Sequence, residues 1–310
     1  MSLTFLVRAT FAAVLALTAA AAPAQKADRL HKQAPPGAER VQTFTPAPAI
    51  WRIADHDTVI YLFGTIHILR PTLKWRSRTL NRVIARADEL VVESSDADFA
   101  ALEGKLVAEM AADMEVKRPP LLDRVRPGKR AAVKRTIDES GFPAAMFDHL
   151  PTWMAVFALG MGGLPDDGAT DEAGADATLE RLFLKAGKPV LSVEDPDAVI
   201  AAVRAIPEAD LLRLLEDEEA YAGDAANEDE AWARGDVSGL AEGLGEADLG
   251  PAVYAALIRD RNRAWTGWLI ERMKRPGTVL FAVGAGHLVG PDSVQAMLAK
   301  RGVASPRIDR

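Results

Sequence analysis

Two stretches far apart in the chain, TVIYLFGTIHILRP (residues 58–71) and TVLFAVGAGHLVGP (residues 278–291), align without a gap. They share Thr, Val, Gly, His and Pro at equivalent positions, and most of their other positions hold apolar residues. Each stretch predicts a buried strand, a glycine that lets the backbone turn, two further residues and then a histidine. The sequence therefore predicts two related strand-Gly-x-x-His units in one fold.

The two histidines, His67 and His287, follow the carboxyl ends of the predicted strands. In an open α/β sheet that edge is where ligands bind, because loops leave the strands there and polar groups converge outside the core. A single strand-end histidine is more often a hydrogen-bonded structural residue, but the repetition favours a functional role for both. We expect the two imidazoles at one site.

Two further apolar runs end in a carboxylate, at Glu93 after Leu-Val-Val and at Glu194 after Leu-Ser-Val. An ionisable group directly after a buried strand favours a functional role for Glu93, because burying a charge without a partner is costly. For Glu194, which precedes Asp195 and Pro196, a turn or helix-cap role is equally open. With the histidines, these residues form the pattern of a metal or acid/base site.

A long helix is predicted from Pro251 to about Arg275, where Pro276-Gly277 would end it. It carries Arg261 and Asn262 on the faces that also hold apolar residues. A cation there needs a partner. It could hold one of the strand-end glutamates, stabilise an oxyanion, or form a purely structural ion pair.

The remaining pattern predicts an α/β domain with a mixed, partly parallel sheet and helical insertions. Apolar runs at 51–55 and 58–64 suggest a hairpin, and helical segments at 75–89 and 176–187 each precede a short apolar run. Prolines and glycines divide 100–160 into several helices. We expect one domain over residues 49–305.

The amino terminus predicts export. Residues 1–24 hold one arginine, an apolar run and an A-P-A arrangement, as in a cleavable signal peptide, whereas a membrane anchor would need a longer apolar stretch. Residues 25–48 predict a flexible linker. Because the chain has no cysteine, lipid modification of a cysteine and disulfide formation are excluded. We expect a periplasmic or secreted protein with no stable membrane insertion after signal removal.

Charge and motifs exclude several classes. The formal net charge is −7, and residues 208–248 contain fourteen Asp or Glu against two Arg, so nucleic-acid binding is not expected. The chain has no H-E-x-x-H motif, no G-x-S-x-G elbow and no cysteine nucleophile. The common zinc-protease, serine-hydrolase and cysteine-protease signatures are therefore absent, and the chain gives no indication of its oligomeric state.

The two Gly-x-x-His motifs, together with the VVE run, GKPVLSVED and the Arg261-Asn262 pair, resemble the TraB/GumN family of Tiki-like proteins over roughly residues 51–303. This resemblance implies a Tiki-type α/β fold. By analogy with animal Tiki proteins it implies a metal-dependent peptidase that uses Mn or Co, the two histidines and a glutamate. In this sequence Ser-Val-Glu194-Asp195 stands where the family pattern has a Leu-Glu-Thr segment, so Glu93 is the better glutamate ligand.

The resemblance assigns roles to single residues. The expected metal ligands are His67, Glu93 and His287, which are also catalytic together with Arg261. Residues expected around the ligands or against the substrate are Gly64, Gly284, Asp176, Glu194 and Asn262. Imidazole and carboxylate ligands suit Mn, Co or Zn.

Three functions remain open. The first is a divalent-metal-dependent hydrolase, a peptidase, acting on a peptide or other small substrate. The second is a metal-independent hydrolase of the erythromycin-esterase type, in which the same His and Glu residues act as general acid and base. The third is a periplasmic protein that binds a ligand and performs no chemistry.

We predict that the exported protein begins near Gln25, because the small residues before it match a signal-peptidase site. Intact-mass measurement of the protein recovered after export should show the loss of residues 1–24. A mass that retains them would place the protein in an anchored class.

Overall fold

The structure, a computed structural model, describes residues 42–161, 168–217, 225–241 and 244–309. The predicted signal peptide and residues 25–41 of the predicted linker lie outside the described residues. Residues 42–48 differ from the prediction, because they pack against the domain. Gln42 Nε2 donates to the Lys74 carbonyl at 2.9 Å, and the Ala47 N–H donates to the Ala233 carbonyl at 2.9 Å.

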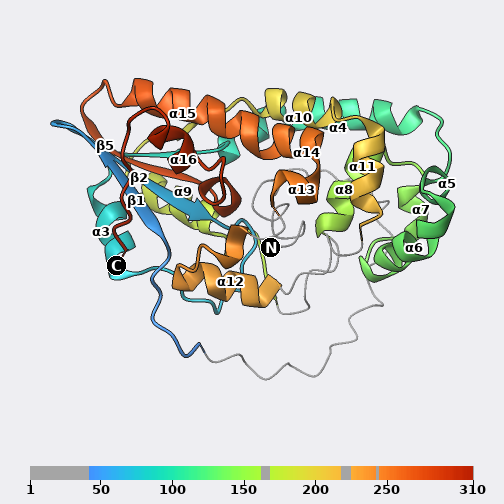
Figure 1. The fold of residues 1–310 in the computed structure, drawn as a ribbon, viewed down its shortest axis with the longest axis horizontal. Helices are drawn as coiled ribbons and strands as arrows, with labels where there is room; N and C mark the ends of the chain where they lie inside the picture. The colour runs from blue at the N-terminus through green and yellow to red at the C-terminus, as the bar shows by residue number, and fades with distance from the viewer. Residues whose placement is uncertain (1–41, 162–167, 218–224, 242–243, 310) are drawn as a thin grey trace.

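A five-stranded mixed sheet organises the chain, in the order β1-β2-β5-β3-β4 (Figure 1). The strands are β1 (Ile50–Ala54), β2 (Thr58–Thr65), β3 (Glu89–Val92), β4 (Val190–Ser192) and β5 (Gly277–Gly284). β1 and β2 form the predicted antiparallel hairpin, and the other neighbouring strands are parallel. The prediction of an α/β fold with a mixed, partly parallel sheet is confirmed.

The two related strands, β2 and β5, lie next to each other. Their sequences align at an offset of 220 residues, from Thr58 to Thr278, but the sheet pairs Thr58 with Gly277. The sheet register is therefore shifted by one residue from the sequence alignment. Gly64 pairs with Val283, and the two Gly-x-x-His loops leave the sheet at staggered positions.

Helices surround this sheet and extend from it. They are α3 (Arg78–Arg86), α4 (Asp96–Glu115), α5 (Leu121–Arg124), α6 (Arg130–Glu139), α7 (Ala144–Phe147), α8 (Thr152–Met161), α9 (Ala175–Lys185), α10 (Pro196–Arg204), α11 (Glu208–Leu215), α12 (Ala225–Arg234), α13 (Glu246–Leu249), α14 (Pro251–Tyr254), α15 (Asp260–Arg272) and α16 (Val294–Ala299). The predicted helices at 75–89 and 176–187 correspond to α3 and α9.

Each face of the sheet has its own apolar core, because successive strand residues point to opposite faces. In β2, Phe63 packs with residues of α3, α9 and α12, whereas Leu62 packs with residues of α15 and α16. Figure 1 shows these two sets of helices on opposite sides of the strands. The sheet is thus covered on both faces, which leaves its strand ends for polar groups.

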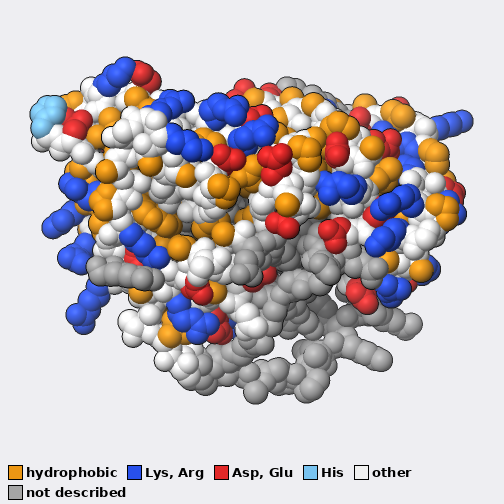
Figure 2. Space-filling view, in the orientation of Figure 1, with side chains coloured by type: hydrophobic (Ala, Val, Ile, Leu, Met, Phe, Trp, Pro, Cys, Tyr) orange, Lys and Arg blue, Asp and Glu red, His pale blue; other side chains and the backbone are white. Residues whose placement is uncertain are grey.

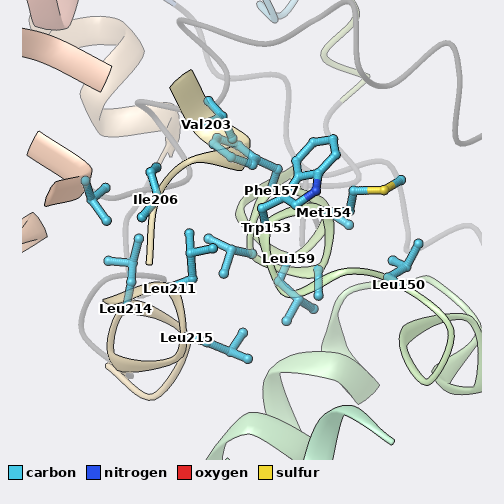
Figure 3. Packing of buried hydrophobic residues seen from close by; sticks show 14 of the residues in the cluster. Leu150, Trp153, Met154, Phe157, Leu159, Val203, Ile206, Leu211, Leu214 and Leu215 are labelled. Carbon is cyan, nitrogen blue, oxygen red and sulfur yellow. The ribbon is translucent and has the colours of Figure 1, made fainter. Parts of the chain in front are cut away.

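A third core joins helices outside the sheet, at the right of Figure 1. Figure 3 shows part of this core, which gathers Trp153, Met154 and Phe157 of α8 with Leu211 and Leu215 of α11. α8 is apolar but has only ten residues, or about 15 Å of helix, against a hydrocarbon core of about 30 Å. Among the described residues, no helix has both the length and the apolar character needed to cross a membrane.

The predicted helix over 251–275 is interrupted. α14 passes into a π-helical segment, η4 (Ala255–Arg259), before α15 begins at Asp260. A π segment shifts the helical register by adding a residue to the turn, and such segments are frequent at functional sites. Here it directly precedes Arg261 and Asn262, both of which are buried.

Gly64 has a role that differs from the predicted one. It lies within β2, and its φ is not positive, so it is not needed for a turn. A Cβ atom at this position would lie 2.9 Å from the Ala285 Cα and 3.2 Å from the Ala285 Cβ. Glycine is therefore required because the loop after β5 passes against β2.

We predict that Gly64→Ala lowers the free energy of unfolding by about 1–3 kcal/mol, because backbone must shift to admit the methyl group. Gly267→Ala, in α15, is the matched control, since its Cβ would meet no atom within 4 Å. That change should instead raise the free energy of unfolding by about 0.5–1 kcal/mol, through helix propensity. Urea unfolding of the two variants tests the contact, and equal effects would contradict it.

Candidate active site at the carboxyl ends of β3 and β5

Arg261 lies at the centre of the polar residues beyond the sheet edge, and its side chain is 8% exposed. Its Nη2 donates to Glu93 Oε2 at 2.5 Å and to Glu194 Oε1 at 2.5 Å, and its Nε donates to Glu194 Oε2 at 3.0 Å. The guanidinium therefore joins two carboxylates, one of them in a bidentate pair. Burial lowers the pKa of Arg261, but the two carboxylates outweigh it and raise that pKa above its ordinary value.

Glu93 follows β3 directly and is buried, as the apolar run before it suggested. Its Oε1 accepts the Gly284 N–H at 2.6 Å, so the second glycine of the repeat binds this carboxylate through its backbone. Burial raises the pKa of Glu93 above its ordinary value, and the positive charge of Arg261 offsets only part of this rise. Glu93 is thus held by Arg261 of α15 and by the backbone at the end of β5.

Glu194 is not a helix cap. The N-cap of α10 is Asp195, whose side chain accepts the Asp197 N–H. Glu194 instead binds Arg261 and accepts the indole N–H of Trp265 at 3.1 Å. Of the two roles left open by the sequence, the structure shows the carboxylate directed to the arginine.

His287 is fully buried in the 3₁₀ turn η5 (Ala285–Leu288) that follows β5. Its Nδ1 lies 2.7 Å from Asn262 Oδ1, while Asn262 Nδ2 donates to the carbonyls of His287 and Asp292. Because the amide N–H groups are directed at carbonyls, the amide oxygen must accept, and His287 Nδ1 must carry the hydrogen. The lone pair of the neutral ring is therefore on Nε2.

That Nε2 atom faces the charged residues. It lies 3.2 Å from Arg261 Nη1 and 3.7 Å from Glu93 Oε1. Burial, and after it the charges of Arg261 and His67, lower the pKa of His287 well below its ordinary value. The Trp265 ring packs against the imidazole at a centroid distance of 4.4 Å. His287 is thus a neutral, oriented imidazole with a lone pair beside a carboxylate and a guanidinium.

His67 has a different environment from its counterpart in the repeat. Its Nδ1 lies 2.8 Å from Asp176 Oδ2, in the first turn of α9. The loop is fixed by the Ala175 N–H, which donates to the Ile66 carbonyl at 2.9 Å. Gly174 is required for this contact, because a Cβ there would lie 2.0 Å from the His67 carbonyl oxygen.

Glu180, which the sequence analysis did not single out, extends this group. It lies one turn after Asp176 on α9, is buried, and accepts the Asp96 N–H at 3.4 Å. Burial raises the pKa of Glu180 to about 7, and the charges of Asp96 and Asp176 add to the increase. The i, i+4 spacing to Asp176 was the one signal in the sequence that could have indicated it.

The structure brings most of the predicted site residues together. Glu93, Glu194, Arg261, Asn262 and His287 form one contact network. His67 is close enough for its charge to lower the pKa of both Glu93 and His287.

The residues that are spaced closely enough to bind a metal ion together lie outside this network. Among the described residues, groups of three or more His, Asp or Glu with ligand atoms all within 4.8 Å of one another are limited to Asp55, His56 and Asp57, exposed in the β1–β2 hairpin. His67, Glu93 and His287 are not spaced as tightly as this, and the guanidinium of Arg261 lies between Glu93 and Glu194.

The family of this chain follows from a comparison with known protein families. The model of the TraB/PrgY/gumN family matches residues 49–307, so the chain belongs to that family. The resemblance found in the sequence is confirmed.

Similar proteins include the uncharacterized protein YbaP of Escherichia coli (strain K12). It is 24% identical over 245 residues, which cover 77% of this chain and 87% of YbaP. YbaP of Shigella flexneri has the same identity and coverage. No solved structure matches the chain.

We predict that Glu180→Gln stabilises the protein at pH 8 and not at pH 5. The folded pKa of about 7 lies above the unfolded value of 4.5, so burying the ionised carboxylate weakens folding above pH 7, and this effect disappears as the pH falls toward 4.5. Urea midpoints of the variant and wild type at both pH values measure the difference. Glu139→Gln, on the exposed side of α6, is the control and should show no such pH dependence. A stabilisation equal at pH 5 and pH 8 would contradict the assignment.

Proposed function

We propose that this protein is a divalent-metal-dependent hydrolase whose substrates are peptides. The observation that carries the proposal is the pair formed by His287 and Glu93. A neutral imidazole with its lone pair on Nε2 lies 3.7 Å from a carboxylate oxygen, at the carboxyl ends of the neighbouring parallel strands β5 and β3. This edge of an α/β sheet is the usual place for a ligand.

The chemistry of the donor set fits a divalent ion in three respects. Asn262 fixes the His287 tautomer in which the Nε2 lone pair is available to a metal ion. A hydrogen-bonded partner commonly has this effect on a metal-binding histidine. Glu93 supplies a carboxylate, and His67, whose charge lowers the pKa of Glu93, is the candidate for a second imidazole. This set suits Mn, Co or Zn. In the structure, the guanidinium of Arg261 balances negative charge of Glu93 and Glu194, and a bound ion would interact with the same Glu93 carboxylate.

When bound, the ion would supply an acidified water and a polarised carbonyl. The protein's own residues have separate tasks. In this proposal His67, Glu93 and His287 would hold the ion, Glu93 would also accept a proton, and Asp176 would orient the His67 ring. Arg261 would donate to the oxyanion that forms during hydrolysis. Glu194 and Trp265 keep the guanidinium in position.

A metal-independent His/Glu hydrolase is the second candidate, and one observation favours it. The position between Glu93 and Glu194 already holds a cation, the Arg261 guanidinium. In this alternative the His67–Asp176 pair acts as general base and Arg261 stabilises the oxyanion. A binding protein without catalysis, the third candidate, would use the same network to hold an anionic ligand.

We also propose a Tiki-type arrangement of the fold and export by the signal peptide at residues 1–24. The paired strand-Gly-x-x-His units support the first. The composition of the amino terminus supports the second.

We predict that His67→Ala and His287→Ala each abolish peptide hydrolysis by Mn- or Co-loaded protein. The first substitution removes an imidazole that the proposal assigns to the metal ion. The second also leaves Asn262 without its partner, at a cost of about 1–3 kcal/mol, so its fold must be checked by urea unfolding. His56→Ala is the control, because that histidine is exposed in the β1–β2 hairpin, in the group formed by Asp55, His56 and Asp57, outside the proposed site.

Metal analysis separates the candidates. A metallohydrolase should bind about one ion per chain, and binding should fall in both site variants while His56→Ala keeps it. Activity that persists after chelation supports the metal-independent reaction. Full activity in either site variant excludes the two-histidine site. Stoichiometric ligand binding with no turnover of a peptide library in the presence of Mn or Co supports the binding protein.

A further inference from the structure

One side of α3 carries an unusual concentration of positive charge. Residues 74–87 contain five basic residues and no Asp or Glu. All five are exposed. We call Lys74, Arg76, Arg78, Arg82 and Arg86 the α3 basic face. Figure 2 shows blue side chains along the left edge of the molecule, where Figure 1 places α3.

These cations have no carboxylate partners in the part of the chain that the structure describes. Arg76 donates to the side chain of Asn81 and Arg82 to that of Thr79, which are neutral contacts. Several exposed cations elsewhere do pair with carboxylates. Those pairs are Lys134 with Asp138, Arg263 with Asp260, and Lys274 with Glu271. The α3 basic face instead gathers five cations without such a partner among the described residues, within thirteen residues of the chain.

The orientation of the helix is fixed. Leu80 and Val83 are buried in the core beneath the sheet, and Ser77 caps the first turn by accepting the Leu80 N–H. Arg78, Arg82 and Arg86 are spaced by four residues, so they follow one side of the helix over about 12 Å. The basic residues cannot turn inward without breaking the core.

The end of α9 continues this face. Lys188 Nζ donates to the carbonyls of Ile84, Ala85 and Ala87, which places it at the carboxyl end of α3. Four residues before it, Leu184 is 64% exposed. A large exposed apolar side chain therefore lies four residues along the chain from Lys188.

We propose that the α3 basic face binds the anionic headgroups of a membrane surface. Unpaired, fixed cations on a chain with a net charge of −7 orient the molecule toward a negative surface, because each basic residue near anionic lipid adds to binding. Leu184 can contact the boundary of the acyl chains. This is peripheral binding, and it needs no membrane-spanning helix.

Nucleic acid fits the same charge less well. Among the described residues, the large apolar side chains that are exposed are Val116, Leu184 and Leu191, so no exposed aromatic ring is available for stacking on bases. The inference is independent of the proposed hydrolase, because no residue of the α3 basic face belongs to that site.

The test is cosedimentation of the full chain with lipid vesicles. Vesicles of phosphatidylcholine are compared with vesicles that contain about 30% phosphatidylglycerol, at low and high salt. The variant Arg78→Gln, Arg82→Gln, Arg86→Gln is compared with the control Lys134→Gln, Arg263→Gln, Lys274→Gln. Both remove three positive charges, and both leave the amino terminus unchanged. Circular dichroism checks the fold of each.

The wild type should bind the anionic vesicles preferentially and release them as salt increases. The α3 variant should bind at least about tenfold more weakly, and the control should bind within about twofold of the wild type. The proposal is overturned if the two triple variants bind equally well, or if the wild type does not distinguish the two vesicle types. It is also overturned if a DNA duplex competes for the protein more effectively than the anionic vesicles.

Discussion

The buried guanidinium of Arg261 is the interaction on which the site depends. Removing three charged side chains from water is costly, and the mutual attraction of the charges offsets that cost only when the geometry satisfies each group. Arg261 meets this requirement by binding Glu93 after β3 and Glu194 after β4, while its remaining nitrogen faces His287 after β5. One side chain on α15 thus fixes the loops that follow three neighbouring strands. Arg261 and the next residue, Asn262, both lie on the buried stripe of α15, which continues through Trp265 and Leu269.

The two related motifs have unequal surroundings because their strands have unequal places in the sheet. β5 lies between β2 and β3, whereas β2 lies between β5 and the hairpin strand β1. His287 therefore meets the residues that follow β3 and β4, is completely buried, and is neutral. His67 lies one strand away and pairs with Asp176 from the next helix. The shift of one residue in register adds to this asymmetry. A repeat in the sequence has produced two imidazoles with different chemistry.

The local pattern of the sequence was sufficient for the strands, the hairpin, the main helices and the positions of the strand-end groups. Each of these depends on residues that are neighbours in the chain. The sequence offered Glu93 and Glu194 as alternative partners of Arg261. It could not show that both bind the arginine, because this depends on β3 and β4 being adjacent in the sheet. Glu180 was missed because its i, i+4 spacing to Asp176 is common on amphipathic helices and gains meaning only once its burial is known. The packing of residues 42–48 against the domain depends on contacts with residues farther along the chain, such as Lys74.

Charge decides how the network could accept a divalent ion. Two carboxylates, one guanidinium and a neutral imidazole carry one net negative charge, which a second cation would reverse. A cation at Glu93 competes with Arg261 for the same oxygens. The bidentate pair with Glu194 gives the guanidinium a partner that remains when Glu93 is released, so Arg261 need not leave the site. Under the metal hypothesis, Glu194 therefore holds the arginine rather than the ion. Under the metal-independent hypothesis, the same pair keeps the oxyanion donor rigid.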